Sequence, residues 1–324
     1  MKRHKLPKWK SLIYENLPVD RATLNLQSSL FNGQVFTWTK DDAAQEYRGT
    51  IKSTYVSLRY SKEGMIEFTG YPDAMNNIEA LLVDYFNLEF NYKEAFKAET
   101  TNANEFMVAY KRAEGMRVIR QDPWECLIGF IISQNNNIKR ISSIMNKLKT
   151  EYGKLVYDAG TRSFHAFPEL ETLLGLEEDD FRAIGCGYRA KYLYSSIRRI
   201  HEKGGAPYLL KLRTQPREHV IKELTGLHGI GMKVADCIAL FSLDQFESVP
   251  IDTHMLQIYY RVFEKSNTKR NYDYIANFYR KQLGKYAGIK HSFMFTLELR
   301  DFKYLEENKE DVVAKKTKKV NKKS

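Results

Sequence analysis

Cysteine is scarce in this sequence, and the three cysteines lie far apart. Cys126, Cys186 and Cys237 form no Cys-x-x-Cys pair, and their number is odd. Such a set argues against a disulfide framework and against a cysteine-rich zinc or iron–sulfur site. The pattern is typical of a protein from a reducing compartment.

Long apolar runs are also missing. No apolar segment approaches the roughly 20 residues of a membrane span. Residues 1–18 are basic, but they contain no apolar core of the kind that a secretory signal needs. We therefore expect neither a secretory signal nor contact with a membrane.

Basic residues outnumber acidic ones, and the 324-residue chain has a formal net charge of +11. This balance favours a polyanionic partner. Six of the lysines lie in the last ten residues, so the remainder of the chain carries only about +5. Residues 308–324 are rich in lysine and lack apolar periodicity, which predicts a disordered tail. That tail could be a solubilising end, a nuclear-import signal or a loose contact with DNA.

Hydrophobic periodicity is typical of strands in the first hundred residues. Residues 47–51 and 55–60 alternate at the strand period, and residues 61–64 supply a hairpin turn. A helix is predicted after Asp73, which would be its N-cap. One apolar face of this helix consists of Ile78, Leu81, Leu82 and Tyr85. We predict that residues 1–102 form an antiparallel β-rich domain with a covering helix.

From about residue 103 the pattern becomes helical. Asp122 and Pro123 predict the start of a helix, because proline is favoured in the first turn. Further helices are predicted around residues 141–148, 193–200, 252–264 and 287–300, and after Pro216. The predicted fold class is therefore α+β, mainly α, with an all-α body over residues 103–307.

The most informative segment is 224–255. A Gly-x-Gly turn formed by Gly229 and Gly231 runs directly into Lys233. Such a turn between two helices presents backbone N–H groups at a helix N-terminus, which is a phosphate site. Asp252 follows nineteen residues after Lys233, and a lysine beside a carboxylate can serve as an activated amine nucleophile. The segment therefore predicts an enzyme that binds a nucleic-acid backbone and attacks a sugar carbon.

Taken singly, each of these features has an ordinary explanation. The two glycines could form a plain helix–helix turn, Lys233 could be a solvated surface charge, and Asp252 could simply cap its helix. A cap position would still fix the carboxylate, and fixed geometry is what a catalytic acid needs. The combination is more specific than its parts.

The two runs 227–236 and 249–254 together resemble the signature of the helix-hairpin-helix base-excision DNA glycosylases. Within that group, members with a lysine at the position of Lys233 are lyases as well as glycosylases. Four further segments resemble the eukaryotic-type 8-oxoguanine DNA glycosylases, and they are residues 32–38, 121–126, 133–140 and 185–192. The resemblance implies damaged double-stranded DNA as the partner, a monomer, and no metal or organic cofactor.

The resemblance also implies a mechanism. The enzyme would flip the damaged base out of the duplex. Lys233 would attack C1′ as the neutral amine, the base would leave, and the Schiff base would allow β-elimination on the 3′ side of the lesion. Asp252 would stabilise the positive charge developing on the sugar or help to deprotonate the amine. The DNA phosphates would be contacted by His254, Gly229 and Gly231.

Four residues would form the base pocket. Gly33 would present its carbonyl to the N7–H of oxidised guanine, whereas plain guanine would leave that acceptor unpaired. Cys237 and Phe295 would sandwich the base. His291 stands where the family usually has a glutamine that reads the Watson–Crick edge. Because imidazole has a different reach, ring-opened purines or a pH-dependent affinity become possible.

On the other strand, Tyr188 resembles the aromatic wedge, and Asn135, Arg140 and Arg189 resemble the trio that holds the estranged cytosine. Three other interpretations remain open: a glycosylase for another damaged purine, a non-catalytic DNA-binding protein, and an RNA-binding helical protein. A eukaryotic source would imply the nucleus or an organelle, and a prokaryotic source the cytoplasm.

Overall fold

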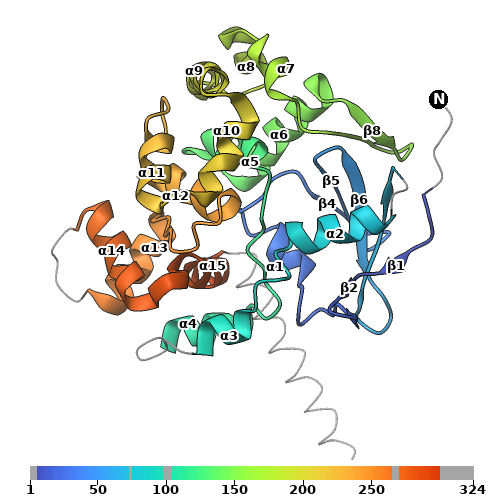
Figure 1. The fold of residues 1–324 in the computed structure, drawn as a ribbon, viewed down its shortest axis with the longest axis horizontal. Helices are drawn as coiled ribbons and strands as arrows, with labels where there is room; N and C mark the ends of the chain where they lie inside the picture. Colours follow the sequence, from blue (N-terminus) through green and yellow to red (C-terminus); the bar gives the residue numbers. More distant parts are fainter. Residues whose placement is uncertain (1–5, 73–74, 98–103, 265–269, 300–324) are drawn as a thin grey trace, which may run out of the picture.

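An antiparallel sheet occupies one end of the molecule and a body of helices the other (Figure 1). The computed structural model describes residues 6–72, 75–97, 104–264 and 270–299. The predicted order, a sheet followed by a helical body, is confirmed. The predicted boundary at residue 102 and the predicted tail lie outside the described residues.

Five strands form the main sheet in the order β1-β7-β6-β5-β4, with each neighbouring pair antiparallel. They are β1 (Lys10–Ser11), β4 (Thr39–Asp41), β5 (Glu46–Ile51), β6 (Thr54–Tyr60) and β7 (Ile66–Tyr71). A separate pair consists of β2 (Ile13–Tyr14) and β3 (Leu17–Pro18). The predicted strands are confirmed, but burial does not alternate along β6, because Tyr55, Val56, Ser57 and Leu58 are all buried.

Helix α2 (Met75–Tyr85) packs on this sheet, as predicted (Figure 1). Ile78 of α2 lies over Gly70. A Cβ added at Gly70 would lie 2.9 Å from Cδ1 of Ile78 and 2.5 Å from the carbonyl oxygen of Tyr55. Gly70 therefore allows the helix and the strands to approach closely. Asp73, the predicted N-cap, lies outside the described residues.

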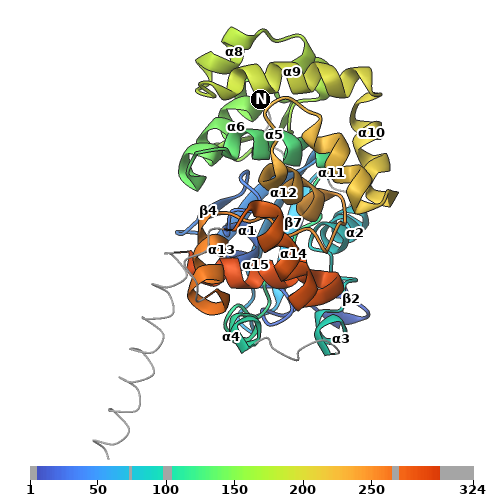
Figure 2. The same ribbon diagram turned by 90° about the vertical axis from the view of Figure 1, so that its left-hand side faces the viewer.

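Helices make up most of the rest of the chain, and Figure 2 shows them in tiers from α8 and α9 down to α14 and α15. The remaining α-helices are α1 (Leu26–Leu30), α3 (Tyr92–Lys97), α4 (Asn104–Arg112), α5 (Pro123–Ser133), α6 (Ile138–Tyr152), α7 (Leu170–Leu174), α8 (Glu178–Ala183), α9 (Arg189–Glu202), α10 (Gly205–Lys211), α11 (Arg217–Thr225), α12 (Met232–Ser242), α13 (Thr253–Ile258), α14 (Tyr272–Leu283) and α15 (Ala287–Glu298). Short turns of other helix types are Leu212–Thr214, Tyr259–Phe263 and Gly284–Tyr286. None of the helices in the described ranges is long and apolar enough to cross a bilayer.

Local capping explains several of the helix boundaries. Asp122 accepts from the backbone N–H of Trp124 at 3.0 Å and so starts α5, and α6 ends at Gly153, both as predicted. The helix predicted around residues 193–200 is confirmed as α9. It ends before Gly204, which adopts a φ of +106° and is followed directly by α10.

The sequence pattern does not reveal one short hairpin inside the helical body. Strand β8 (Leu155–Asp158) pairs with β9 (Ser163–His165). Tyr157 of this hairpin stacks on Tyr55 of the main sheet, with ring centroids 4.4 Å apart. The hairpin therefore depends on a tertiary contact more than on its own periodicity.

A buried carboxylate joins the helices that carry Lys233 and flank Asp252. Asp236 of α12 has no exposed side-chain surface, and it accepts from Arg217 Nη2 at 2.6 Å and from the Tyr272 hydroxyl at 2.7 Å. Burial and the adjacent Asp236 raise the pKa of Tyr272, so the hydroxyl stays protonated and donates. The Tyr272 oxygen accepts in turn from the N–H of Ile251 at 3.3 Å. One network thus holds α11, α12, α14 and the loop before α13.

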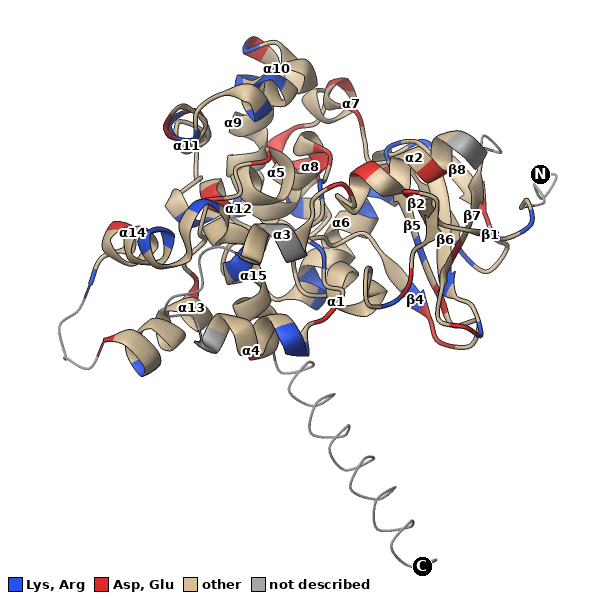
Figure 3. Ribbon diagram, turned by 60° about the horizontal axis from the view of Figure 1, so that its bottom comes forward, with Lys and Arg blue, Asp and Glu red and all other residues tan. Residues whose placement is uncertain are grey.

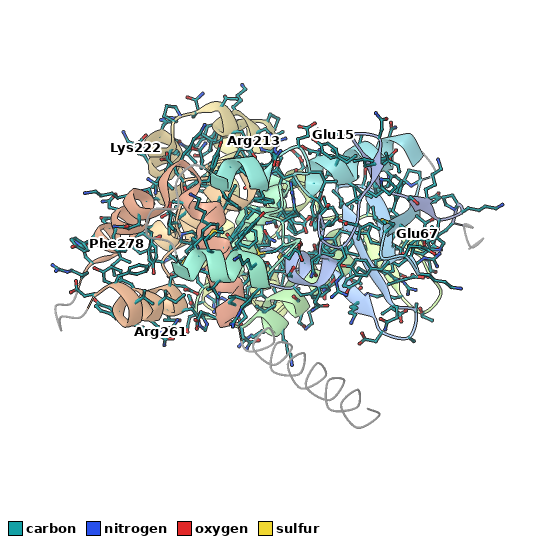
Figure 4. All side chains as sticks on the ribbon, turned by 90° about the horizontal axis from the view of Figure 1, so that it is seen from below. Glu15, Glu67, Arg213, Lys222, Arg261 and Phe278 are labelled. Atoms are coloured by element: carbon teal, nitrogen blue, oxygen red, sulfur yellow. The ribbon has the colours of Figure 1, made fainter. Side chains whose placement is uncertain are left out.

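We expect Arg217→Met to lower the free energy of unfolding by about 3–5 kcal/mol, because it leaves the buried Asp236 without its cation. The control is Arg261→Met, which breaks an ion pair with Glu298. The Arg261 side chain is 55% exposed and lies at the periphery of the helices (Figure 4), so its loss costs less than about 1 kcal/mol. Denaturant unfolding of both variants measures the difference, and equal losses would contradict the role given to Asp236.

Candidate active site

The turn between α11 and α12 is shaped to present its backbone. Gly229 has a φ of +79°, and a Cβ there would lie 2.4 Å from the ring of Tyr192, so only glycine fits. Gly231 is the exposed N-cap of α12, and nothing lies within 4 Å of the position that its Cβ would occupy. The first N–H groups of α12 are therefore accessible to a phosphate oxygen.

Lys233 and Asp252 are held by the first turns of two different helices. Lys233 is half-buried in α12, and its Nζ lies 5.8 Å from the centre of the Phe130 ring. Asp252 is the N-cap of α13 and accepts from the backbone N–H of Met255 at 2.9 Å. This bond confirms the expected cap, and it fixes the carboxylate in one orientation.

A groove in the protein surface adjoins a smaller pocket, and the two share part of their lining. The residues common to both are Gly33, Phe130, Lys233, Asp252 and Phe295. Lys233 and Asp252 therefore lie at the entrance of the pocket, where the groove meets it. A substrate in the groove that inserted one group into the pocket would pass directly between these two side chains.

His291 of α15 is the most unusual group in the pocket. It is 4% exposed, and neither of its ring nitrogens has a hydrogen-bond partner in the described part of the chain. Burial lowers the pKa of His291 to about 4, although the nearby Asp252 carboxylate and Pro250 carbonyl act in the opposite direction. The neutral ring therefore offers one donor and one acceptor to a bound ligand.

The other walls of the pocket are apolar or uncharged. Burial raises the pKa of the Cys237 thiol to about 11, against the lowering effect of the nearby Lys233, so the thiol stays neutral. The Phe295 ring lies nearly parallel to the His291 ring, at 11° with centroids 6.4 Å apart. With Gly33, these side chains bring together the four predicted base-pocket residues. Their individual roles stay predictions.

The side chain of Arg189, which is predicted to contact cytosine, is buried and donates hydrogen bonds to backbone carbonyls of the protein. Its side chain is 4% exposed, and it donates to the carbonyl of Gln134 at 2.7 Å and to that of Asn135 at 2.9 Å. It also donates to the Cys186 carbonyl at 3.3 Å. Arg189 therefore supports the loop that presents Asn135, which lines the groove with a φ of +46°.

The remaining members of that predicted group are more exposed. The Tyr188 ring is 49% exposed, and its hydroxyl donates to the Gln134 carbonyl at 3.2 Å, which suits a projecting wedge. Arg140 is exposed on α6 and is not among the residues that line the groove. The structure thus brings Tyr188, Asn135 and Arg189 together. A joint contact of these residues and Arg140 with cytosine stays a prediction.

Two basic residues of the groove are missed by the sequence argument. Lys139 is exposed on α6, and Arg270 precedes α14, where it pairs with Glu264 at 3.2 Å. His254, predicted to contact a phosphate, also lines the groove. Elsewhere acidic and basic residues are mixed over the sheet and the helices (Figure 3). Binding of a polyanion would therefore depend on the groove more than on a single charged face.

Metal ligands do not gather in the described ranges: no three His, Cys, Asp or Glu side chains lie close enough to hold an ion. The polar groups that do converge are an amine, a carboxylate, a neutral imidazole and backbone N–H groups. That set can support nucleophilic attack by an amine next to a bound phosphate.

Comparison with known proteins agrees with this geometry. The sequence model for the 8-oxoguanine DNA glycosylase N-terminal domain matches residues 16–127, and the one for the HhH-GPD superfamily of base excision DNA repair proteins matches residues 128–282. The chain is 34% identical over 302 residues to N-glycosylase/DNA lyase OGG1 of Arabidopsis thaliana, covering 90% of this chain and 81% of that protein. It is 30% identical over 325 residues to N-glycosylase/DNA lyase of Saccharomyces cerevisiae, covering 88% and 86% respectively.

A solved structure is similar over nearly the whole chain. It is the Clostridium acetobutylicum 8-oxoguanine glycosylase/lyase in complex with double-stranded DNA containing cytosine opposite 8-oxoguanine. The two proteins are 26% identical with a TM-score of 0.78, and the match covers 95% of this chain and all of the other (100%). The apo-form of the same bacterial enzyme has a TM-score of 0.76 at 28% identity, covering 85% of this chain and 93% of that one.

The buried imidazole makes stability depend on pH. The pKa of His291 is about 4 in the folded protein and 6.5 ordinarily, so folding favours the neutral ring. Its contribution is fully present above about pH 6.5 and is lost as the pH falls towards about 4, by roughly 3 kcal/mol in all. Denaturant unfolding of the wild type and of His291→Gln between about pH 4 and pH 6.5 measures how much His291 contributes to the pH dependence of the free energy of unfolding. Identical pH dependence in the two proteins would contradict it.

Proposed function

Because this chain belongs to the 8-oxoguanine DNA glycosylases of the helix-hairpin-helix superfamily, we propose that it excises 8-oxoguanine paired with cytosine from duplex DNA and then cleaves the abasic strand. Family membership makes it an N-glycosylase and DNA lyase. The observation that carries the substrate proposal is the place of Lys233 and Asp252, at the entrance from a surface groove to the smaller pocket. The DNA complex of the bacterial relative supports the same partner.

The proposed reaction begins when the lesion leaves the stack and enters the pocket, which places C1′ of its sugar between Lys233 and Asp252. The neutral amine of Lys233 forms a bond to C1′ as the bond from C1′ to the base breaks. The carboxylate of Asp252 stabilises the positive charge that develops on the sugar, and it is also the nearby group suited to take the proton of the amine.

The covalent intermediate accounts for the second activity. The sugar opens to a Schiff base between C1′ and Nζ of Lys233, which acidifies the C2′ proton. Loss of that proton expels the 3′ phosphate and nicks the strand. Hydrolysis of the Schiff base then releases the amine, so that the enzyme turns over without a cofactor.

Recognition of the lesion is proposed to depend on the Gly33 carbonyl. In oxidised guanine, N7 carries a hydrogen and can donate a hydrogen bond to this carbonyl. In plain guanine, N7 has a lone pair and cannot donate. The mismatch of two acceptors in a buried pocket costs about 1–3 kcal/mol, enough to reject the normal base by roughly fivefold to 150-fold. Cys237 and Phe295 supply the uncharged surfaces on which the base stacks.

A second candidate function is excision of a different damaged purine, and His291 is the observation that favours it. A glutamine amide points its donor and its acceptor in similar directions away from one carbon, whereas the two ring nitrogens of an imidazole point their donor and acceptor in widely divergent directions. A base with another arrangement of edge groups, including a ring-opened purine, could satisfy the unpaired nitrogens of His291.

We also propose that the protein acts as a monomer, since the groove and the pocket are complete within one chain. Its compartment would be that of the chromosomal DNA, which is the nucleus for a eukaryotic source and the cytoplasm for a prokaryotic one.

Lys233→Gln separates binding from chemistry. We expect the variant to bind an 8-oxoguanine·cytosine duplex with nearly unchanged Kd and to lose single-turnover excision by on the order of 10³-fold or more, because the nucleophile is gone. The control is Lys222→Gln, an exposed lysine of α11 (Figure 4) outside the groove, which should behave as the wild type. A Lys233→Gln protein that still excises the base would refute the proposed nucleophile.

His291→Gln tests the reading of the base. Because glutamine restores the amide that the family usually has at this position, we expect excision of 8-oxoguanine to persist and its preference over guanine to be kept or improved. Single-turnover rates on 8-oxoguanine, a ring-opened purine and guanine, each opposite cytosine, provide the measurement. Abolished excision of 8-oxoguanine would show that the pocket is adapted to another base.

A further inference from the structure

The turn that carries Gly33 is held by its two neighbours, Asn32 and Gln34, which the mechanism above leaves unused. Both are buried, at 3% and 2% exposure. Gly33 has a φ of +87° and lines both the groove and the pocket. Its carbonyl accepts no hydrogen bond from any residue that the structure describes, so it is available to a ligand.

Asn32 determines the direction of that carbonyl. Its Oδ1 accepts from the backbone N–H of Gln34 at 3.2 Å. This N–H belongs to the same peptide unit as the Gly33 carbonyl. Because a trans peptide is planar and its N–H and C=O point in opposite directions, a bond that holds the N–H also orients the carbonyl, away from the Asn32 side chain.

The amide nitrogen of Asn32 is tied to the helix that forms the pocket wall. Nδ2 donates to Thr296 Oγ1 at 3.2 Å, and the Thr296 hydroxyl donates to the Ser292 carbonyl at 2.8 Å. These two residues of α15 directly follow Phe295 and His291, which line the pocket. Asn32 therefore couples the orientation of the Gly33 carbonyl to the position of α15.

Gln34 anchors the far side of the turn. Its side-chain nitrogen donates to two backbone carbonyls, at 2.7 and 2.8 Å, and its side-chain oxygen accepts from a backbone N–H at 2.9 Å. Its own carbonyl accepts from Gln121 Nε2 at 2.7 Å. These bonds fix the chain at Gln34. The orientation of the peptide unit between Gly33 and Gln34 is then set by the hydrogen bond from its N–H to the Asn32 side chain.

We propose that Asn32 is a positioning residue for base discrimination, which aims the Gly33 carbonyl at the N7 position of the flipped purine. The inference rests on the proposed function, because it concerns the reading of the same base. Asn32 has no hydrogen bond to Lys233 or Asp252. It therefore acts on the choice of base and leaves the chemistry at the sugar unchanged.

Asn32→Leu tests this inference, because leucine has a similar volume and removes the hydrogen bonds of Asn32 to Gln34, Thr296 and Met116. Single-turnover rates are measured on duplexes with 8-oxoguanine, guanine or an abasic site opposite cytosine. The abasic duplex has no base to read, so its cleavage reports the Lys233 chemistry alone. We expect 8-oxoguanine excision relative to abasic cleavage to fall about threefold to tenfold, without a parallel fall on guanine.

Two further variants separate positioning from general damage to the fold. Asn32→Asp keeps an acceptor for the Gln34 N–H, so its rate of 8-oxoguanine excision relative to abasic cleavage should be close to that of the wild type. Thr296→Val removes the tether of Asn32 to α15, together with the bonds that the Thr296 hydroxyl donates, but keeps the bond of Asn32 to the Gln34 N–H. It should therefore lower 8-oxoguanine excision relative to abasic cleavage less than Asn32→Leu does. An unchanged ratio in Asn32→Leu, or an equal fall on all three duplexes, overturns the role of Asn32. A wild type that cleaves abasic DNA but never excises 8-oxoguanine overturns the proposed substrate, and this inference with it.

Discussion

The buried carboxylate of Asp236 is the constraint on which the site depends. Through Arg217 it ties α11 to α12, and so fixes the hairpin from which Lys233 projects. Through the Tyr272 hydroxyl it reaches the N–H of Ile251, the residue before Asp252. An amine and a carboxylate that lie nineteen residues apart in the chain are thereby held in one rigid frame. Their positions are set by this network and by the cap of α13, without a direct bond between the two side chains.

Electrostatics divide the site into two parts. The groove presents cations and free N–H groups, which suit a phosphate backbone. The pocket beyond it is kept uncharged, since burial raises the pKa of the Cys237 thiol and lowers that of the His291 imidazole. A neutral purine can therefore leave water at little electrostatic cost, and the free Gly33 carbonyl becomes a selective acceptor because water does not compete for it.

Much of this arrangement could be predicted from the sequence, and the physical reasons are local. Gly229 is required by its own φ and by the ring of Tyr192, Asp252 by the helix that it caps, and Pro123 by the first turn of α5. Such requirements restrict the residue type at positions within a short segment, so short sequence motifs identify them.

What the sequence could not predict depends on contacts between distant segments. The β8–β9 hairpin is held by the stacking of Tyr157 on Tyr55, and its strands are too short for periodicity to identify. Arg189 was expected to contact the estranged cytosine, and its hydrogen bonds to the carbonyls of Gln134, Asn135 and Cys186 join segments that no local pattern connects. The central claim is that Lys233 reacts with the sugar of 8-oxoguanine paired with cytosine. Borohydride trapping tests it most directly, on duplexes with 8-oxoguanine opposite cytosine, 8-oxoguanine opposite adenine, and plain guanine, followed by peptide mapping of the adduct. The account predicts a covalent adduct on Lys233 with the cytosine-paired lesion alone; no adduct, or an adduct on another amine, would contradict it.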